Sequence, residues 1–261
     1  MFRTRALSAL VLAPPALAAA WMGGYAFAAL AALAAGLMCW EWHGMVTRRF
    51  DASGRIAALC CAASCVLAVA RPQWAVGLVA AGAAASAGLV APALRRWAAA
   101  GAAYAGWPAV ALVWLRSGAA GGRDVLFWLL LVVWATDIGA YACGRLIGGP
   151  LLAPAISPKK TWAGLLGGMA AAAGVGAAFA ALSGRGVPAP LATGSALLAV
   201  VAQAGDFLES WVKRRWGVKD ASSIIPGHGG VLDRVDGLLA AAAAVAMATF
   251  ASGTDVLAWN W

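Results

Sequence analysis

The sequence predicts an all-α, polytopic integral membrane protein with about nine transmembrane helices and a cytoplasmic N-terminus. Of its 261 residues, 63% are hydrophobic and 11% are charged, whereas soluble domains carry roughly 25% charged residues. The chain also contains 32 glycines and many alanines, which permit close helix packing in lipid. We therefore expect residues 1–261 to form a single membrane domain.

The expected spans are the apolar runs between charged positions, because a helix needs about 20 residues to cross a bilayer. They lie near residues 6–21, 24–42, 56–70, 73–94, 97–115, 125–142, 163–182, 190–207 and 237–252. The first run also resembles a signal peptide, since Arg3 and Arg5 precede it and Ala18–Ala20 resembles a cleavage site. An uncleaved first span is the favoured interpretation.

The positive charges are distributed unevenly between the loops of this nine-span arrangement. Four of the 19 Lys and Arg residues fall on one side, and the remaining 15 fall on the side of the N-terminus. Those four are Arg71, Arg116, Arg123 and Arg185. Because cytoplasmic loops carry the excess of Lys and Arg, the N-terminus is expected in the cytoplasm. The net charge of +9 then reflects membrane topology, and we expect no nucleic-acid partner.

The cysteines predict neither a disulfide framework nor a metal site. All five lie in or beside apolar runs, and none forms a CxxC pair. We expect them to behave as small buried hydrophobic residues.

Most of the chemistry is concentrated in residues 205–236, a polar segment in an otherwise apolar chain. Asp206 and Ser210 are four residues apart and Lys213 is three further on, so a helix places them on one face. Asp233 and Asp236 are three apart at the start of the last span. Charged groups at a membrane indicate a functional site.

These carboxylates and the serine hydroxyl are predicted to bind Mg²⁺, which prefers oxygen ligands and shares its shell with phosphates. Asp206, Asp233 and Asp236 can converge across two neighbouring helices, and Ser210 adds a hydroxyl oxygen on the face of Asp206. The alternative is that Asp233 and Asp236 form interfacial salt bridges with Arg234 and Lys219. Spacing alone leaves both interpretations open.

Two further polar groups are candidates for phosphate contact. The turn Pro226–Gly230 contains three glycines, whose backbone N–H groups can approach a phosphate. His228 within it is either a phosphate donor or a structural hydrogen-bonding group. The segment 157–162 contains Lys159 and Lys160 between Ser157 and Thr161; it is either a phosphate site or a basic flank of the next span.

Asp137 lies well inside the sixth expected span. An acidic side chain there needs water or a partner, either within a site or in a structural pair with Arg145.

At this point the sequence resembles a known family. The run from Ser210 to Asp236, with Lys213-Arg214, Lys219-Asp220, Pro226-x-His228-Gly229-Gly230 and Asp233-Arg234-Val235-Asp236, looks like the full signature of the phosphatidate cytidylyltransferase family. The segments 137–141, 144–145 and 157–162 also resemble it. One departure is Ala163, where the family usually has Glu. The motif-bearing part is 134–240, and residues 1–130 resemble the family only in the rhythm of their spans.

The resemblance implies transfer of a cytidylyl group from CTP to phosphatidate with Mg²⁺, in phospholipid biosynthesis at a bacterial inner membrane, with the site facing the cytoplasm. It implies catalytic roles for Asp206, Ser210, Lys213, Asp233 and Asp236. It also implies that the metal ligands are Asp206, Ser210, Asp233 and Asp236. The residues implied to bind substrate are Lys159, Lys160, Ser157, Arg214, Lys219, His228, Gly229, Gly230 and Asp137. The expected partners are CTP, phosphatidate and membrane lipids, and a homodimer is an arrangement that the sequence allows.

Three alternatives remain. A transporter also places Asp and glycine-rich breaks near its substrate, but it is expected to lack a dense Lys/Arg/Asp cluster at one face. A different CTP-using or CDP-alcohol membrane enzyme is the second alternative, and a non-catalytic scaffold that has kept the motif is the third. Release of pyrophosphate from CTP that depends on phosphatidate distinguishes all four.

Overall fold

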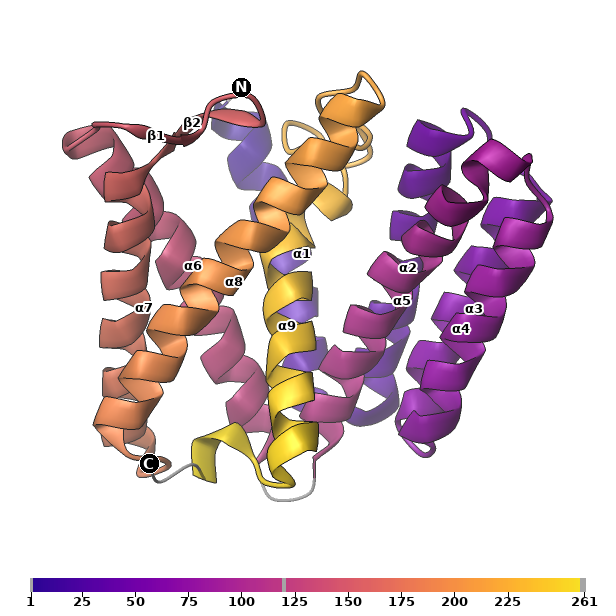
Figure 1. The fold of residues 1–261 in the computed structure, drawn as a ribbon. Helices are drawn as coiled ribbons and strands as arrows, with labels where there is room; N and C mark the ends of the chain where they lie inside the picture. The colour runs from indigo at the N-terminus through magenta and orange to yellow at the C-terminus, as the bar shows by residue number, and fades with distance from the viewer. Residues whose placement is uncertain (1, 119–120, 259–261) are drawn as a thin grey trace. The chain divides into compact units, whose positions relative to one another are not determined.

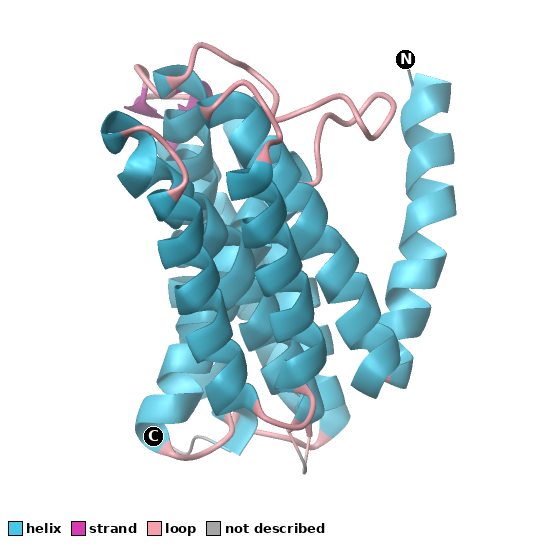
Figure 2. Ribbon diagram, turned by 90° about the vertical axis from the view of Figure 1, so that its right-hand side faces the viewer, coloured by secondary structure: helices cyan, strands magenta, loops and turns pink. Residues whose placement is uncertain are grey.

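The computed structural model describes residues 2–118 and 121–258, and helices form nearly all of its secondary structure (Figures 1 and 2). The side chains of Arg3 and Arg5, which support the predicted orientation, lie outside the described part. The chain divides into two compact units. Unit 1 comprises residues 1–123 and 213–235, and unit 2 comprises residues 124–212 and 236–261.

Unit 1 contains the N-terminal helices and the polar segment between the last two long helices. Its elements are α1 (Phe2–Met22), α2 (Gly24–Val46), α3 (Ala52–Ala68), α4 (Pro72–Gly88), the 3₁₀ helix η1 (Pro92–Leu94) and α5 (Arg95–Ser117). Helix α2 packs on α3 and α5, and α4 packs on α3 and α5. Small residues permit this packing: a Cβ added to Gly101 on α5 would overlap the Trp42 ring on α2. The Trp42 indole also donates to the Trp97 carbonyl at 2.8 Å.

Unit 2 contains the rest of the long helices. Its elements are α6 (Gly122–Leu146), β1 (Leu151–Ala153), β2 (Ser157–Thr161), α7 (Trp162–Ser183), α8 (Pro188–Arg215), α9 (Leu232–Ser252) and the 3₁₀ helix η2 (Val256–Ala258). The first two residues of α6, the last three of α8 and the first four of α9 fall within unit 1. Glycine again allows close contact: a Cβ on Gly139 of α6 would lie 2.6 Å from the Gly167 carbonyl oxygen of α7. Arg185, before α8, pairs with Asp124 at 2.9 Å and with Asp255 at 3.2 Å.

The prediction of an apolar, helical membrane protein is confirmed, but the count of nine spans is not. Each expected span overlaps a helix in the described residues, although the span expected at 73–94 runs past the end of α4 at Gly88 and into η1. Six helical segments there are long and apolar enough to cross a membrane: Gly24–Val46, Pro92–Ser117, Gly122–Leu146, Trp162–Ser183, Pro188–Arg215 and Leu232–Ser252. Helices α3 and α4 have 17 residues each, at the lower limit of about 17–25 for a span.

A small β-hairpin departs from the all-α prediction. Strands β1 and β2 pair antiparallel, with Leu151 opposite Thr161 and Ala153 opposite Ser157. The sequence predicts a loop here because this segment carries no alternating apolar pattern. The two strands are only three and five residues long. The hairpin presents the Lys159-Lys160 pair from an extended backbone directly before α7.

Candidate functional site

The first polar cluster of the site lies in unit 2, where β2 meets α8. Lys160 Nζ on β2 lies 2.6 Å from Asp206 Oδ2 on α8. The same Nζ lies 4.4 Å from the centroid of the Phe207 ring, a cation–π contact. Ser210 Oγ donates to Asp206 Oδ1 at 3.3 Å. The predicted helical face of Asp206 and Ser210 is therefore confirmed, and Lys160 joins it from a separate element.

The two adjacent lysines occupy different environments because β2 is extended. Successive side chains of a strand point to opposite faces. Lys160 is half-buried against Asp206 and Phe207, whereas Lys159 is exposed. At the end of the strand, the Thr161 hydroxyl accepts from the Gly164 N–H at 3.0 Å and so caps α7.

Close contact between α8 and α9 occurs beside Asp206. A Cβ added to Gly205 would lie 2.5 Å from Ala240 Cβ and 2.8 Å from the Asp236 carbonyl oxygen. Real side chains do not approach so closely, so glycine is required at this position. Asp236 accepts from the Gly237 N–H at 2.8 Å through Oδ1. Within unit 2, the backbones that carry Asp206 and Asp236 are therefore adjacent.

The second polar cluster lies in unit 1 and centres on Asp233, in the first turn of α9. Its Oδ1 lies 2.5 Å from Lys213 Nζ, and the two side chains are 4% and 11% exposed. Its Oδ2 accepts from the backbone N–H groups of Ala221, at 2.9 Å, and Gly230, at 2.8 Å. Asp233 therefore pairs with Lys213, a residue expected to be catalytic, and the carboxylate organises the segment before it.

The glycine turn that precedes Asp233 is closed by its own backbone. Ile225 and Gly229 form an isolated bridge, and the His228 N–H donates to the Ile225 carbonyl at 2.9 Å. Gly229 has a φ of +87°, which favours glycine. The Gly230 N–H is already bonded to Asp233. The buried His228 Nδ1 has no hydrogen-bond partner among residues 2–118 and 121–258, so His228 retains capacity to bind a ligand.

Unit 1 fixes this segment by contacts that the sequence does not predict. Arg48 donates to the Trp216 carbonyl at 2.9 Å, and the Trp216 ring meets the Trp97 ring edge-on at a centroid distance of 5.6 Å. Glu41 on α2 accepts hydrogen bonds from residues 222, 231 and 232. The one signal for Glu41 in the sequence is a lone acidic residue inside a long apolar run.

The remaining predicted residues have the following positions in their own elements. Arg214 donates to the Val218 carbonyl at 3.2 Å, and Lys219 is exposed in the same segment. Asp137 is exposed on α6, where Arg145 donates to the Tyr141 hydroxyl at 3.0 Å. Ser157 begins β2.

The predicted metal ligands carry oxygen donors. Asp206, Ser210, Asp233 and Asp236 offer carboxylate and hydroxyl oxygens, which Mg²⁺ prefers. Among the described residues, no group of three or more His, Cys, Asp or Glu side chains is gathered as a ready-made metal site. Instead, lysines neutralise Asp206 and Asp233.

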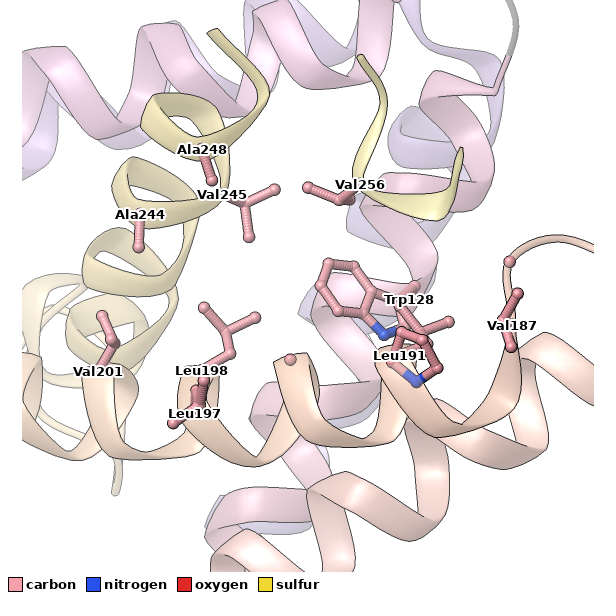
Figure 3. Close-up of a pocket in the computed structure, with 13 residues that line it drawn as sticks. Trp128, Val187, Leu191, Leu197, Leu198, Val201, Ala244, Val245, Ala248 and Val256 are labelled. Carbon is pink, nitrogen blue, oxygen red and sulfur yellow. The ribbon is translucent and has the colours of Figure 1, made fainter. Parts of the chain in front are cut away.

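Unit 2 also contains an apolar pocket, shown in Figure 3. Trp128, Leu191, Leu198 and Val245 are among the residues that line it. The Trp128 indole N–H is satisfied by Ser195 Oγ at 3.1 Å. The pocket is therefore suited to hydrocarbon, and none of the polar side chains described above lines it.

Comparison with known proteins gives a consistent result. The profile of the Cytidylyltransferase family matches residues 3–251. The chain is 43% identical over 249 residues to a phosphatidate cytidylyltransferase of Brucella suis biovar 1 (strain 1330), an alignment covering 92% of this chain and 90% of the relative. It is 44% identical over 125 residues to that of Haemophilus influenzae, covering 46% and 43% of the two chains. It is 40% identical over 119 residues to that of Bacillus subtilis (strain 168), covering 45% and 44%.

Proposed function

Because the chain belongs to the cytidylyltransferase family, we propose that it transfers a cytidylyl group from CTP to phosphatidate, giving CDP-diacylglycerol and pyrophosphate. The observation that carries this proposal is the 43% identity to the Brucella suis relative over 92% of the chain. The signature residues identified in the sequence lie inside the matched region 3–251.

The reaction joins two anions, so the site must offset their repulsion. A phosphatidate oxygen attacks the α-phosphorus of CTP, and negative charge develops on the departing pyrophosphate. Positioning and electrostatic stabilisation supply most of the catalysis in such transfers. In our proposal, Lys160 and Lys213 contact phosphate oxygens, and Arg214, Lys219 and the exposed Lys159 attract the nucleotide.

We assign the metal ligands to Asp206, Ser210, Asp233 and Asp236. When bound, Mg²⁺ neutralises phosphate charge and stabilises the leaving pyrophosphate. The support is the donor chemistry of these residues. Asp206 pairs with Lys160, and Asp233 pairs with Lys213. Each of these carboxylates therefore has a lysine beside it that could bind an incoming phosphate. The turn around His228, Gly229 and Gly230, with Ser157 and Asp137, completes the proposed substrate-binding set.

We place the protein in a bacterial inner membrane with nine spans, a cytoplasmic N-terminus and a cytoplasmic site. The support is the excess of Lys and Arg in one set of loops, together with the cytoplasmic location of nucleotides. Phosphatidate would enter sideways from the bilayer, so its acyl chains stay in hydrocarbon. A homodimer stays a prediction.

The test is a pyrophosphate-release assay on purified protein in detergent–lipid micelles with Mg²⁺. We expect pyrophosphate only when CTP and phosphatidate are both present, and CDP-diacylglycerol in equal amount. Diacylglycerol without the phosphate serves as the substrate control, and Lys160→Ala as the protein control. A transporter would release no pyrophosphate, and a different lipid transferase would release it with another acceptor.

A further inference from the structure

Glu41 is a buried acidic residue that no signature motif contains. It lies on α2 in unit 1, and its side chain is 1% exposed. Burying a carboxylate is costly unless hydrogen bonds replace the lost water. Three donors do so here. Ser222 Oγ donates to Oε1 at 2.7 Å, the Val231 N–H donates to Oε1 at 2.7 Å, and the Leu232 N–H donates to Oε2 at 2.8 Å.

Two of these donors lie at the N-terminal end of α9. Helix α9 begins at Leu232, and the first N–H groups of a helix have no acceptor within the helix. A carboxylate at this end also interacts favourably with the helix dipole. Glu41 therefore caps α9, although it lies 190 positions before Val231 in the chain. Helices are usually capped by a side chain that is close in the sequence.

The capped residues directly precede Asp233. Asp233 receives the Gly230 N–H at 2.8 Å and Lys213 at 2.5 Å, so the segment 230–233 is held by carboxylates on both sides. A Cβ added to Gly230 would overlap Glu41 Oε1. The glycine of the signature is therefore required for the close approach of Glu41, in addition to any role in contacting phosphate.

We propose that Glu41 is a positioning residue for the transfer reaction: it holds the start of α9 and the 222–232 segment so that Asp233 and Lys213 are fixed in place. The expected loss of kcat rests on the proposed function. The expected loosening of the 222–232 segment does not. Glu41 acts through Asp233 and does not contact substrate.

The test compares Glu41→Gln with His43→Gln, a matched control on the same helix. His43 is also fully buried, and its partners are the Cys39 carbonyl at 3.0 Å, Ser86 Oγ at 3.2 Å and Ser53 Oγ at 3.4 Å, not the 222–232 segment. The substitution Glu41→Gln keeps the size of the side chain, but the new amide presents a donor to one of the N–H groups from which the carboxylate accepts.

Two readouts are measured on full-length protein. Hydrogen exchange of peptides covering 221–232 should be faster in Glu41→Gln, with peptides from α3 and α4 unchanged. In the enzyme assay, kcat should fall by about ten- to a hundredfold, the usual effect of losing a residue that orients a metal-binding side chain. KM for CTP should stay close to wild type. His43→Gln should show neither change.

A third variant tests whether the effect passes through the observed hydrogen bonds. Ser222→Ala should give a smaller loss of kcat, and the double variant should lose less than the sum of the two, because both remove the same hydrogen bond. Unchanged exchange in 221–232, or an equal loss of kcat in His43→Gln, would overturn the proposal. Absence of all cytidylyl transfer in the wild type would instead refute the proposed function, and the exchange data would still decide the role of Glu41.

Discussion

Lys160 and Asp206 connect the β-hairpin to α8 through an ion pair with an Nζ–Oδ2 distance of 2.6 Å. The side chains are 19% and 35% exposed, so the pair is accessible to an incoming ligand. An anionic substrate that takes Lys160 would release the Asp206 carboxylate for a cation. In the proposed mechanism, the ion pair would hold the two side chains until substrate and cation replace it.

This arrangement predicts different effects for the two adjacent lysines. Lys160→Ala should lower kcat/KM by at least about tenfold, since loss of a contact worth ~1.4 kcal/mol changes a rate tenfold. Lys159→Ala should have a smaller effect that weakens further with added salt, because an exposed charge contributes less than about 1 kcal/mol. Steady-state kinetics with each substrate varied in turn measure both. Equal losses would contradict the separation of the two side chains by β2.

The acidic residues are predicted to be essential for turnover. Asp206→Asn and Asp233→Asn should each lose most activity at saturating Mg²⁺ while the protein still inserts and folds, because each removes a charged ligand worth several kcal/mol in the transition state. Asp255→Asn is the control, since Asp255 pairs with Arg185 at 3.2 Å and has no proposed role. Near-wild-type turnover of either first variant would refute the ligand assignment.

The contact between α8 and α9 predicts that Gly205 cannot be enlarged. Gly205→Ala should destabilise the protein by roughly 1–3 kcal/mol, the usual cost of overpacking, and should lower activity because Asp206 is the next residue. Gly194→Ala on the same helix is the control, since a Cβ there meets nothing within 4 Å. Thermal unfolding and the transfer assay measure the two effects. A Gly205→Ala protein as stable and active as Gly194→Ala would contradict the close approach.

Two exposed serines on either side of α8 test the membrane orientation. In a variant without the five native cysteines, Ser223→Cys should react with an impermeant reagent only from the cytoplasmic side, and Ser183→Cys only from the other side. The basis is the excess of Lys and Arg in the loops assigned to the cytoplasm. Labelling in intact cells and in inverted vesicles distinguishes the sides. Reversed labelling would place the signature segment away from CTP.

The helices and the polar residues could be predicted from the sequence because both leave local patterns. The apolar runs mark the helices, and the four-residue spacing of Asp206 and Ser210 predicts the face on which the structure joins them at 3.3 Å. The pairings of Lys160 with Asp206 and of Glu41 with Val231 could not be predicted, because they depend on tertiary packing between distant segments. The hairpin was missed because its strands are short and β2 is polar.

The anchoring of the signature segment on α2 has a consequence for engineering. Residues 1–123 carry few motifs, yet the acceptor for Val231 and Leu232 and the aromatic partner of Trp216 both come from them. A shortened protein that begins at α6 would contain every signature residue and lack the supports that hold them. Exchange of the N-terminal helices between relatives should succeed only when the donor supplies an equivalent carboxylate at position 41 and a ring at position 97.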